Sequence, residues 1–145
     1  MRKKIVWILA LFILLSLIGL ADSIYLTYKH YAATQLLCLL STGCDTVTTS
    51  PQAYIFGIYI AIYGIIYYAL IFLLSIFLIT MNYARNANYH KLLNYMRKVL
   101  PYVTIIGFFA SIYFLYLQAF VIGAFCTWCI ISAIDSTLLF ILGIY

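Results

Sequence analysis

Long apolar stretches separated by short polar connections dominate this chain, and four of the stretches reach the length that a membrane requires. A bilayer core about 30 Å thick needs roughly 20 apolar residues in a helix. Segments at about 5–28, 55–80, 99–122 and 124–145 meet this requirement, and the first is interrupted only by Asp22. Helices pair every backbone amide internally, as lipid demands. The pattern predicts an all-α integral membrane protein, with four transmembrane helices bundled in one domain over residues 1–145.

The composition excludes several other classes of protein. Hydrophobic residues make up 68% of the chain and charged residues 8%, whereas a soluble domain has about 45–50% apolar and about 25% charged residues. The mean hydropathy of +1.13 agrees. A soluble globular protein, a disordered chain and a conventional nucleic-acid-binding protein are all excluded, and the surroundings of the chain are membrane lipid.

The basic residues predict the orientation of the helices. Of the eight Lys and Arg residues, only Lys29 falls in the first connection, and the others lie before the first helix or between the second and third. The positive-inside rule therefore places both termini and the 81–98 connection in the cytoplasm. Residues about 29–54 and the turn near Gly123 then face outward from the cell membrane. The net charge of +5 is better explained by topology than by a binding patch.

The N-terminal segment also fits a second description. A basic start, an apolar run and the small-x-small sequence Gly19-Leu20-Ala21 are typical of a cleaved secretory signal. Because the apolar helical pattern continues through Ile24 to Tyr28, we expect an uncleaved transmembrane helix. An N-terminus at Asp22 in the mature protein would contradict this expectation.

All four cysteines fall on the predicted outer side, in two pairs of different kinds. Cys38 and Cys44 lie in the long outer loop, whereas Cys126 and Cys129 form Cys-Thr-Trp-Cys where the fourth helix begins. Positions i and i+3 share a helix face, so a disulfide there constrains little, and a helix N-terminus favours a reactive thiolate. Small residues one turn further on, Ser132 and Ala133, would leave room for a planar ligand.

Three interpretations of these pairs compete. Two inert structural disulfides are possible, although the helical pair would be a poor staple. A four-cysteine zinc site fits poorly with a five-residue gap and a membrane helix, since structural zinc prefers short spacings on loops. A relay of two redox-active pairs, exchanging electrons through mixed disulfides, fits best. No metal is expected.

A thiol oxidant in a membrane needs a lipid-soluble electron acceptor, and a quinone meets that need. Aromatic residues at the outer ends of the helices could sandwich its ring, although an interfacial aromatic belt explains most of them. The candidates are Tyr25, Phe56, Tyr59, Tyr113, Tyr116 and Phe125.

Two acids lie within the helices. Asp22, near the depth of Cys126, is a candidate for moving protons, and Asp135, deeper, should be paired with a polar partner.

Several motifs resemble the vitamin K epoxide reductase family, specifically its prokaryotic single-domain members. They are Asp22-Ser23-Ile24-Tyr25-Leu26-Thr27, Cys44-Asp45-x-Val47-x-x-Ser50, Phe56-Gly57, and Phe125 to Ala133 around the Cys-x-x-Cys. The DsbB family also makes four-helix, quinone-linked thiol oxidants, but there the order of the two cysteine pairs is reversed. The order found here favours the first family.

The resemblance implies a mechanism and a site. It implies a short half-helix after the loop cysteines, acting as a lid over a quinone near the outer leaflet. Cys38 would exchange with a thioredoxin-like partner, Cys44 would pass electrons to Cys126, and Cys129 would face the quinone. Ser50 would lie near the ring, where its hydroxyl could bond an oxygen or a thiolate; Ser50 before Pro51 is also a good helix start.

The sequence departs from the family pattern at three points. Many prokaryotic members have Pro at the position of Tyr59, and many carry a fused thioredoxin-like domain. Because this sequence lacks the fused thioredoxin-like domain, we expect a separate, DsbA-like partner on the outer side. The animal enzymes have Tyr at the position of Ala133, which weakens the case for epoxide chemistry.

The sequence thus predicts a thiol:quinone oxidoreductase that makes disulfides, with Cys38, Cys44, Cys126 and Cys129 as catalytic residues. Around a ubiquinone- or menaquinone-type molecule we expect Ser50, Phe56, Asp22, Tyr113 and Ala133. Two alternatives stay open: a non-catalytic, disulfide-stapled membrane scaffold, and a quinone or vitamin K (epoxide) reductase working in the opposite direction.

Overall fold

The computed structural model describes residues 2–32, 43–84 and 90–144, and four long helices account for most of them. The helices are α1 (Arg2–Tyr31), α3 (Ile60–Ala84), α4 (His90–Tyr116) and α5 (Thr127–Ile144). A π-helical segment, η3 (Leu117–Ile122), continues α4. Within the described ranges these four helices are long and apolar enough to cross a membrane, which confirms the predicted all-α membrane fold.

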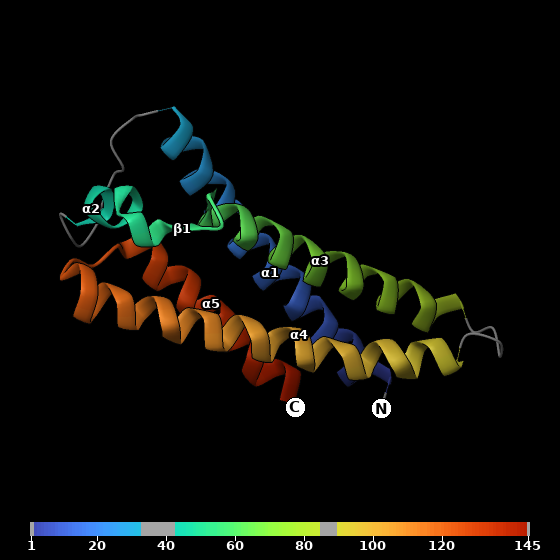
Figure 1. Ribbon diagram of the computed structural model, residues 1–145. Coiled ribbons are helices and arrows are strands. Elements are labelled where there is room, and N and C mark those ends of the chain that lie inside the picture. The colour runs from blue at the N-terminus through green and yellow to red at the C-terminus, as the bar shows by residue number, and fades with distance from the viewer. Residues whose placement is uncertain (1, 33–42, 85–89, 145) are drawn as a thin grey trace.

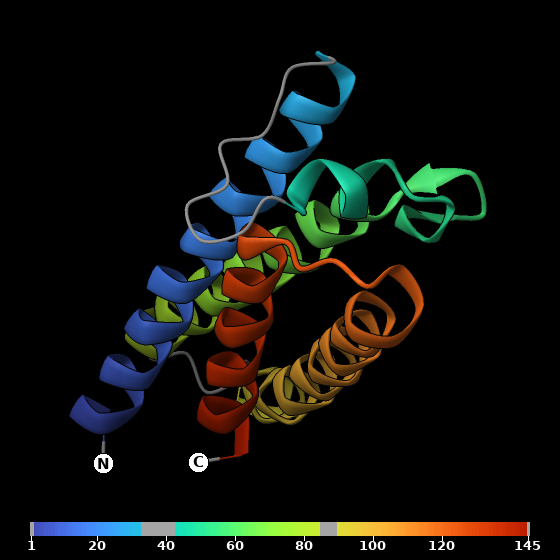
Figure 2. The ribbon, with the colours of Figure 1, turned by 90° about the vertical axis from the view of Figure 1, so that its left-hand side faces the viewer.

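The helices form a bundle in which each packs against two others (Figure 1). α1 packs on α3 and α5, and α4 packs on α5 and α3. Both chain termini lie at the end of the bundle opposite the short helix α2 (Cys44–Thr49), as Figures 1 and 2 show. An even number of crossings produces this arrangement, because each helix reverses the direction of the one before it.

Glycines allow the helices to approach closely in the middle of the bundle. At Gly19 of α1 an added Cβ would overlap the ring of Tyr68 in α3, and at Gly107 of α4 it would overlap the ring of Tyr67. Small residues at such crossings are typical of membrane helices, whose association depends on close packing rather than on exclusion of water. Two tyrosines from adjacent positions of α3 are thus held between α1 on one side and α4 on the other.

A small cap covers one end of the bundle. It consists of α2 (Cys44–Thr49), the 3-10 turn η1 (Pro51–Ala53) and an antiparallel hairpin of β1 (Tyr54–Ile55) and β2 (Ile58–Tyr59). Phe56 and Gly57 form the two-residue hairpin turn with φ values of 52° and 78°. Positive φ at both positions is typical of the turns that suit the twist of a hairpin. The cap includes the short half-helix that the family resemblance implies.

The second, third and fourth helices begin at residues other than those expected. The second helix begins at Ile60 rather than near 55, because residues 54–59 pair as the hairpin. The third begins at His90 rather than near 99, because the second half of the basic connection is helical and joins the apolar span without a break. The fourth begins at Thr127 rather than near 124, since Gly123 adopts a left-handed conformation that ends η3.

Candidate functional site

The cap joins the bundle through a buried apolar cluster that contains two of the cysteines. Cys44 at the start of α2 and Cys126 just before α5 are both fully buried in it. Val47, Tyr59 and Leu26 pack around them from α2, the hairpin and α1. The loop cysteine and the first cysteine of the Cys-x-x-Cys motif, 82 residues apart in the sequence, therefore belong to one packed cluster.

The cysteines are in different redox states in this structure. Cys44 is disulfide-bonded, whereas Cys126 and Cys129 carry free thiols. The prediction for Cys38 lies outside the described residues. A reduced pair in the helix motif beside an oxidised loop cysteine is one of the states that a two-pair relay would pass through.

Cys126 is the N-cap of α5 rather than a residue within the helix. Its carbonyl accepts the hydrogen bond of the Ile130 amide at 3.1 Å, as an N-cap residue does. A hydrogen bond with the Cys129 thiol lowers the pKa of Cys126, and the backbone amides of Cys129 and Trp128 act in the same direction against the effect of burial. The first turn of α5 therefore stabilises a thiolate at Cys126.

A cavity of about 320 Å³ lies beside this pair, beneath the cap. Its walls come from α1, α3, α4, η3, α5 and the cap, and its lining is mostly apolar. Cys129 lines the cavity, whereas Cys126 does not. A small, largely apolar cavity with a few polar groups is the usual form of a ligand site, and the second cysteine of the motif faces it.

Ser50 lines this cavity, but its hydroxyl is already engaged. Its Oγ donates a hydrogen bond to the carbonyl oxygen of Val47 at 2.7 Å. Ser50 occupies the N-cap position of η1 with Pro51 next to it, as the sequence suggests, but its side chain makes no capping bond. In this conformation the Ser50 oxygen can accept a further hydrogen bond but has no proton to donate.

The other predicted ligand contacts divide into those that reach the cavity and those that do not. Ala133 lines it and is buried. Phe56 stands 97% exposed at the hairpin turn, and Tyr113 is 56% exposed on α4. Neither lines this cavity, although the sequence predicts both beside a quinone. Positions 107, 111, 114 and 118 lie on the face of α4 and η3 that lines the cavity. Residue 113 lies on a different face of α4.

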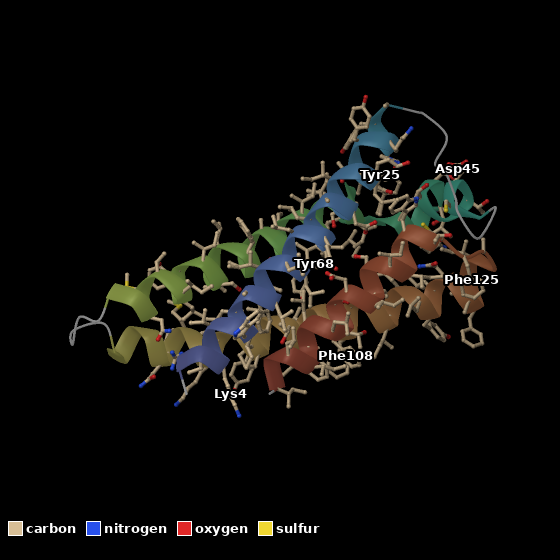
Figure 3. All side chains as sticks on the ribbon, turned by 180° about the vertical axis from the view of Figure 1, so that it is seen from behind. Lys4, Tyr25, Asp45, Tyr68, Phe108 and Phe125 are labelled. Carbon is tan, nitrogen blue, oxygen red and sulfur yellow. The ribbon has the colours of Figure 1, made fainter. Side chains whose placement is uncertain are left out.

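The remaining aromatic candidates lie at the capped end of the bundle. Tyr59 lines the cavity and stacks on His30, with ring centroids 4.0 Å apart. Tyr25 packs against Trp128 of the cysteine motif at 4.8 Å. Figure 3 shows Tyr25, Asp45 and Phe125 at this end and Lys4 at the other. Asp22 is buried and does not line the cavity, although its neighbour Ser23 does.

Two cavity residues were not anticipated from the sequence. Gln118 in η3 is buried, and its Oε1 accepts a hydrogen bond from the backbone N–H of Cys126 at 3.0 Å. Tyr67 lines the cavity, and its buried hydroxyl has no hydrogen-bond partner in the described part of the chain. An amide in the middle of an apolar stretch was a signal for Gln118, since buried polar residues in membranes are costly. One Tyr among fifteen carried no such signal.

A dithiol at a helix start, with its second cysteine lining a largely apolar cavity inside a membrane bundle, is an arrangement suited to a membrane thiol oxidoreductase. The model of the Vitamin K epoxide reductase family matches residues 10–144, and the chain belongs to that family. It is thus a multi-pass membrane protein with quinone-linked thiol oxidoreductase or reductase activity. No individual curated protein matches the chain.

Proposed function

We propose that the protein is a thiol:quinone oxidoreductase that generates disulfides in partner proteins. Electrons would pass from the partner to Cys38 and Cys44, then to Cys126 and Cys129, and finally to a quinone of the ubiquinone or menaquinone type. The observation that supports this order is the division between the two motif cysteines. Cys126 is packed with Cys44 in the buried cluster, and Cys129 lines the cavity.

The exchange steps need no reactant other than the partner dithiol and the four cysteines. A partner dithiol reduces the loop disulfide and becomes a disulfide itself. The Cys44 thiolate attacks the Cys126 sulfur of an oxidised motif, forming a mixed disulfide while Cys129 leaves and takes a proton. Cys38 then attacks Cys44, which restores the loop disulfide and releases Cys126. A low pKa at Cys126 favours its departure in this last step, because a more acidic thiol leaves faster.

The cavity has the features that a quinone ring requires. A bound quinone would accept the two electrons and two protons that leave the reduced motif. The small side chain of Ala133 and the rings of Tyr59 and Tyr63 line the space. The Tyr67 hydroxyl, which has no partner among the described residues, is an unused donor at the cavity wall. We assign Tyr67 the role of hydrogen-bonding a quinone oxygen, in place of the Ser50 hydroxyl, whose proton is engaged.

The partner and the orientation form part of the same proposal. A separate thioredoxin-like, DsbA-like protein would meet the loop cysteines on the outer side of the cell membrane. Both termini would lie in the cytoplasm, as the basic residues at positions 2–4 and 85–98 favour. An extracytoplasmic location suits this chemistry because disulfides persist there.

Quinone reduction by the purified protein tests the proposal. Protein in detergent is mixed with a reduced dithiol and a short-chain quinone, and the loss of quinone is followed by absorbance. We expect turnover above the uncatalysed rate, and no turnover after Cys129→Ala. Full activity in that variant, or none in the wild type with reducible thiols, would contradict the relay.

Replacement of Cys38 provides the matched comparison. Cys38→Ala should spare reduction by the small dithiol, which can reach the motif directly, but abolish reduction by a thioredoxin-like protein.

Thiol trapping separates the relay from an inert scaffold. A relay shows interchanging disulfides under mild reductant, including Cys44–Cys126, whereas a scaffold keeps one pattern.

A further inference from the structure

Two carboxyl groups are buried in the interior of the bundle, where no function has yet been assigned to the pair. Asp22 of α1 is 6% exposed and Asp135 of α5 is 4% exposed. Both oxygens of Asp22 and one oxygen of Asp135 are buried without a hydrogen-bond partner among the residues described. The two groups lie within electrostatic reach of each other. Unpartnered carboxyl oxygens in a membrane are costly, so an acidic residue placed in this way is a candidate for a function.

Two hydroxyl groups lie between these carboxyls. The Ser132 side chain lies beside Asp22, and the Tyr68 hydroxyl lies beside Asp135. The Tyr68 hydroxyl is 3.0 Å from both the Oγ and the carbonyl oxygen of Ser132. Figure 3 labels Tyr68 in this inner layer of the bundle. The resulting order is Asp22, Ser132, Tyr68, Asp135, across α1, α5 and α3.

If both carboxyls are ionised, these four side chains have fewer hydrogen-bond donors than their acceptors require. Ser132 and Tyr68 each supply one hydroxyl proton, and an ionised carboxylate can only accept. Two donors cannot serve four carboxylate oxygens and the Ser132 carbonyl together. A proton on one carboxyl supplies another donor and removes one of two like charges from a region of low dielectric constant. The geometry therefore favours a pair that holds a proton.

The pair is linked to the thiols and to the cavity. Asp22 lies within electrostatic reach of both Cys126 and Cys129. Ser132 and Tyr68, between the carboxyls, both line the cavity. The other titratable groups facing the pair are Tyr67 on α3 and Tyr59 on the hairpin. Within the described ranges neither carboxyl forms an ion pair with a basic residue, so a proton is the available counter-charge.

We propose that Asp22 and Asp135 form a shared proton-binding pair that takes a proton from the thiols and returns it toward the cavity. This inference rests on the proposed thiol:quinone activity and adds the route of one proton. When the Cys126–Cys129 bond forms, two S–H bonds break, two electrons pass to the quinone and two protons end on its oxygens. One of these protons forms an O–H bond on Asp22 in transit and leaves along the Ser132 and Tyr68 hydroxyls. The two carboxyls then hold the same number of protons as before the reaction.

Transfer of a proton from a thiol to an anionic carboxylate conserves charge inside the membrane. Loss of the thiol proton to bulk water would instead leave an uncompensated thiolate beside Asp22. Asp22 and Asp135 act here as proton carriers that do not touch the ring, which agrees with their absence from the cavity wall.

The composition of the chain makes a direct test possible. Its three acidic residues are Asp22, Asp45 and Asp135, so protein labelled with ¹³C at the Asp side-chain carboxyl gives three signals. Their shifts report protonation at each site. The signals are titrated with pH in the dithiol and disulfide forms, without quinone. We expect Asp22 and Asp135 to titrate together and to differ between the two forms.

Variants then test the coupling and its use in turnover. Asp135→Asn should change the titration of Asp22, and Asp45→Asn, which removes the same charge at the surface, should not. Asp22→Asn should slow quinone reduction by roughly 100-fold, the typical effect of losing a positioned proton acceptor, and Asp22→Glu should restore part of it. Independent titration of Asp22 and Asp135, unchanged by the redox state of the thiols, would overturn the proposal even if the variants fold poorly. Coupled titration in a wild-type protein that reduces no quinone would instead overturn the proposed function.

Discussion

The side-chain oxygen of Gln118 accepts a hydrogen bond from the backbone N–H of Cys126 at 3.0 Å. This bond crosses from the π-helical end of the third span to the start of the fourth, around the left-handed turn at Gly123. Both partners are buried, so the bond is well shielded from water. It holds the backbone of the first motif cysteine at the edge of the cavity.

Replacement of Gln118 should therefore disturb the motif. Gln118→Leu leaves the Cys126 amide buried without an acceptor, at a cost of about 1–3 kcal/mol. We expect slower quinone reduction, by about tenfold for each 1.4 kcal/mol that appears in the transition state. Steady-state kinetics with a short-chain quinone measure the effect. Asn94→Leu, the same kind of change at an exposed position of α4, should leave the rate unaltered.

The acidity of Cys126 should depend on its neighbour in the motif. The Cys129 thiol is the main cause of the lowered pKa of Cys126, so Cys129→Ala should raise that pKa. A group with a lowered pKa is ionised over a pH range in which an ordinary thiol is protonated. The pH midpoint for alkylation of Cys126 by a small neutral reagent should shift upward in the variant. A midpoint that stays in place would show that the helix amides alone set the acidity.

The crossing of α1 and α3 should tolerate no side chain at Gly19. A Cβ there overlaps the Tyr68 ring, and overpacking of this kind costs about 1–3 kcal/mol. Gly19→Ala should lower the thermal unfolding temperature in detergent and weaken the bond from Tyr68 to Ser132. Ala21→Leu, two residues later on the exposed side of α1, serves as the control. Equal stability of the two variants would argue against close packing at Gly19.

The cavity should be the place where quinone affinity is determined. Ala133→Leu fills space at the wall and should raise the KM for quinone. Tyr67→Phe should raise it more modestly, by removing one hydrogen-bond donor. Phe56→Ser and Tyr113→Ser change aromatic residues outside the cavity, and their KM values should match the wild type. A raised KM in these two variants, with Ala133→Leu unaffected, would place the quinone elsewhere.

The candidate site was only partly predictable. The spacing of Cys126 and Cys129 indicated a reactive helix-start pair, because i and i+3 relationships depend on local geometry alone. The aromatic contacts were harder to choose. Phe56 and Tyr113 have the right chemistry, but a hairpin turn and a helix rotation direct them away from the cavity. Tyr67 and Tyr68 were indistinguishable in sequence from the other tyrosines.

The sequence by itself determined the class of the protein, since the four apolar spans and the two cysteine pairs follow from local composition and spacing. A helix of sufficient apolar length must cross the bilayer whatever surrounds it. Only the tertiary structure decided which residues come together: Cys44 and Cys126 share one buried cluster, Gln118 bonds the Cys126 amide, and Asp22 lies within electrostatic reach of Asp135. These contacts depend on how far each helix is rotated and how closely it approaches its neighbours. Packing of all four helices and the cap sets both quantities, and no local pattern encodes either of them.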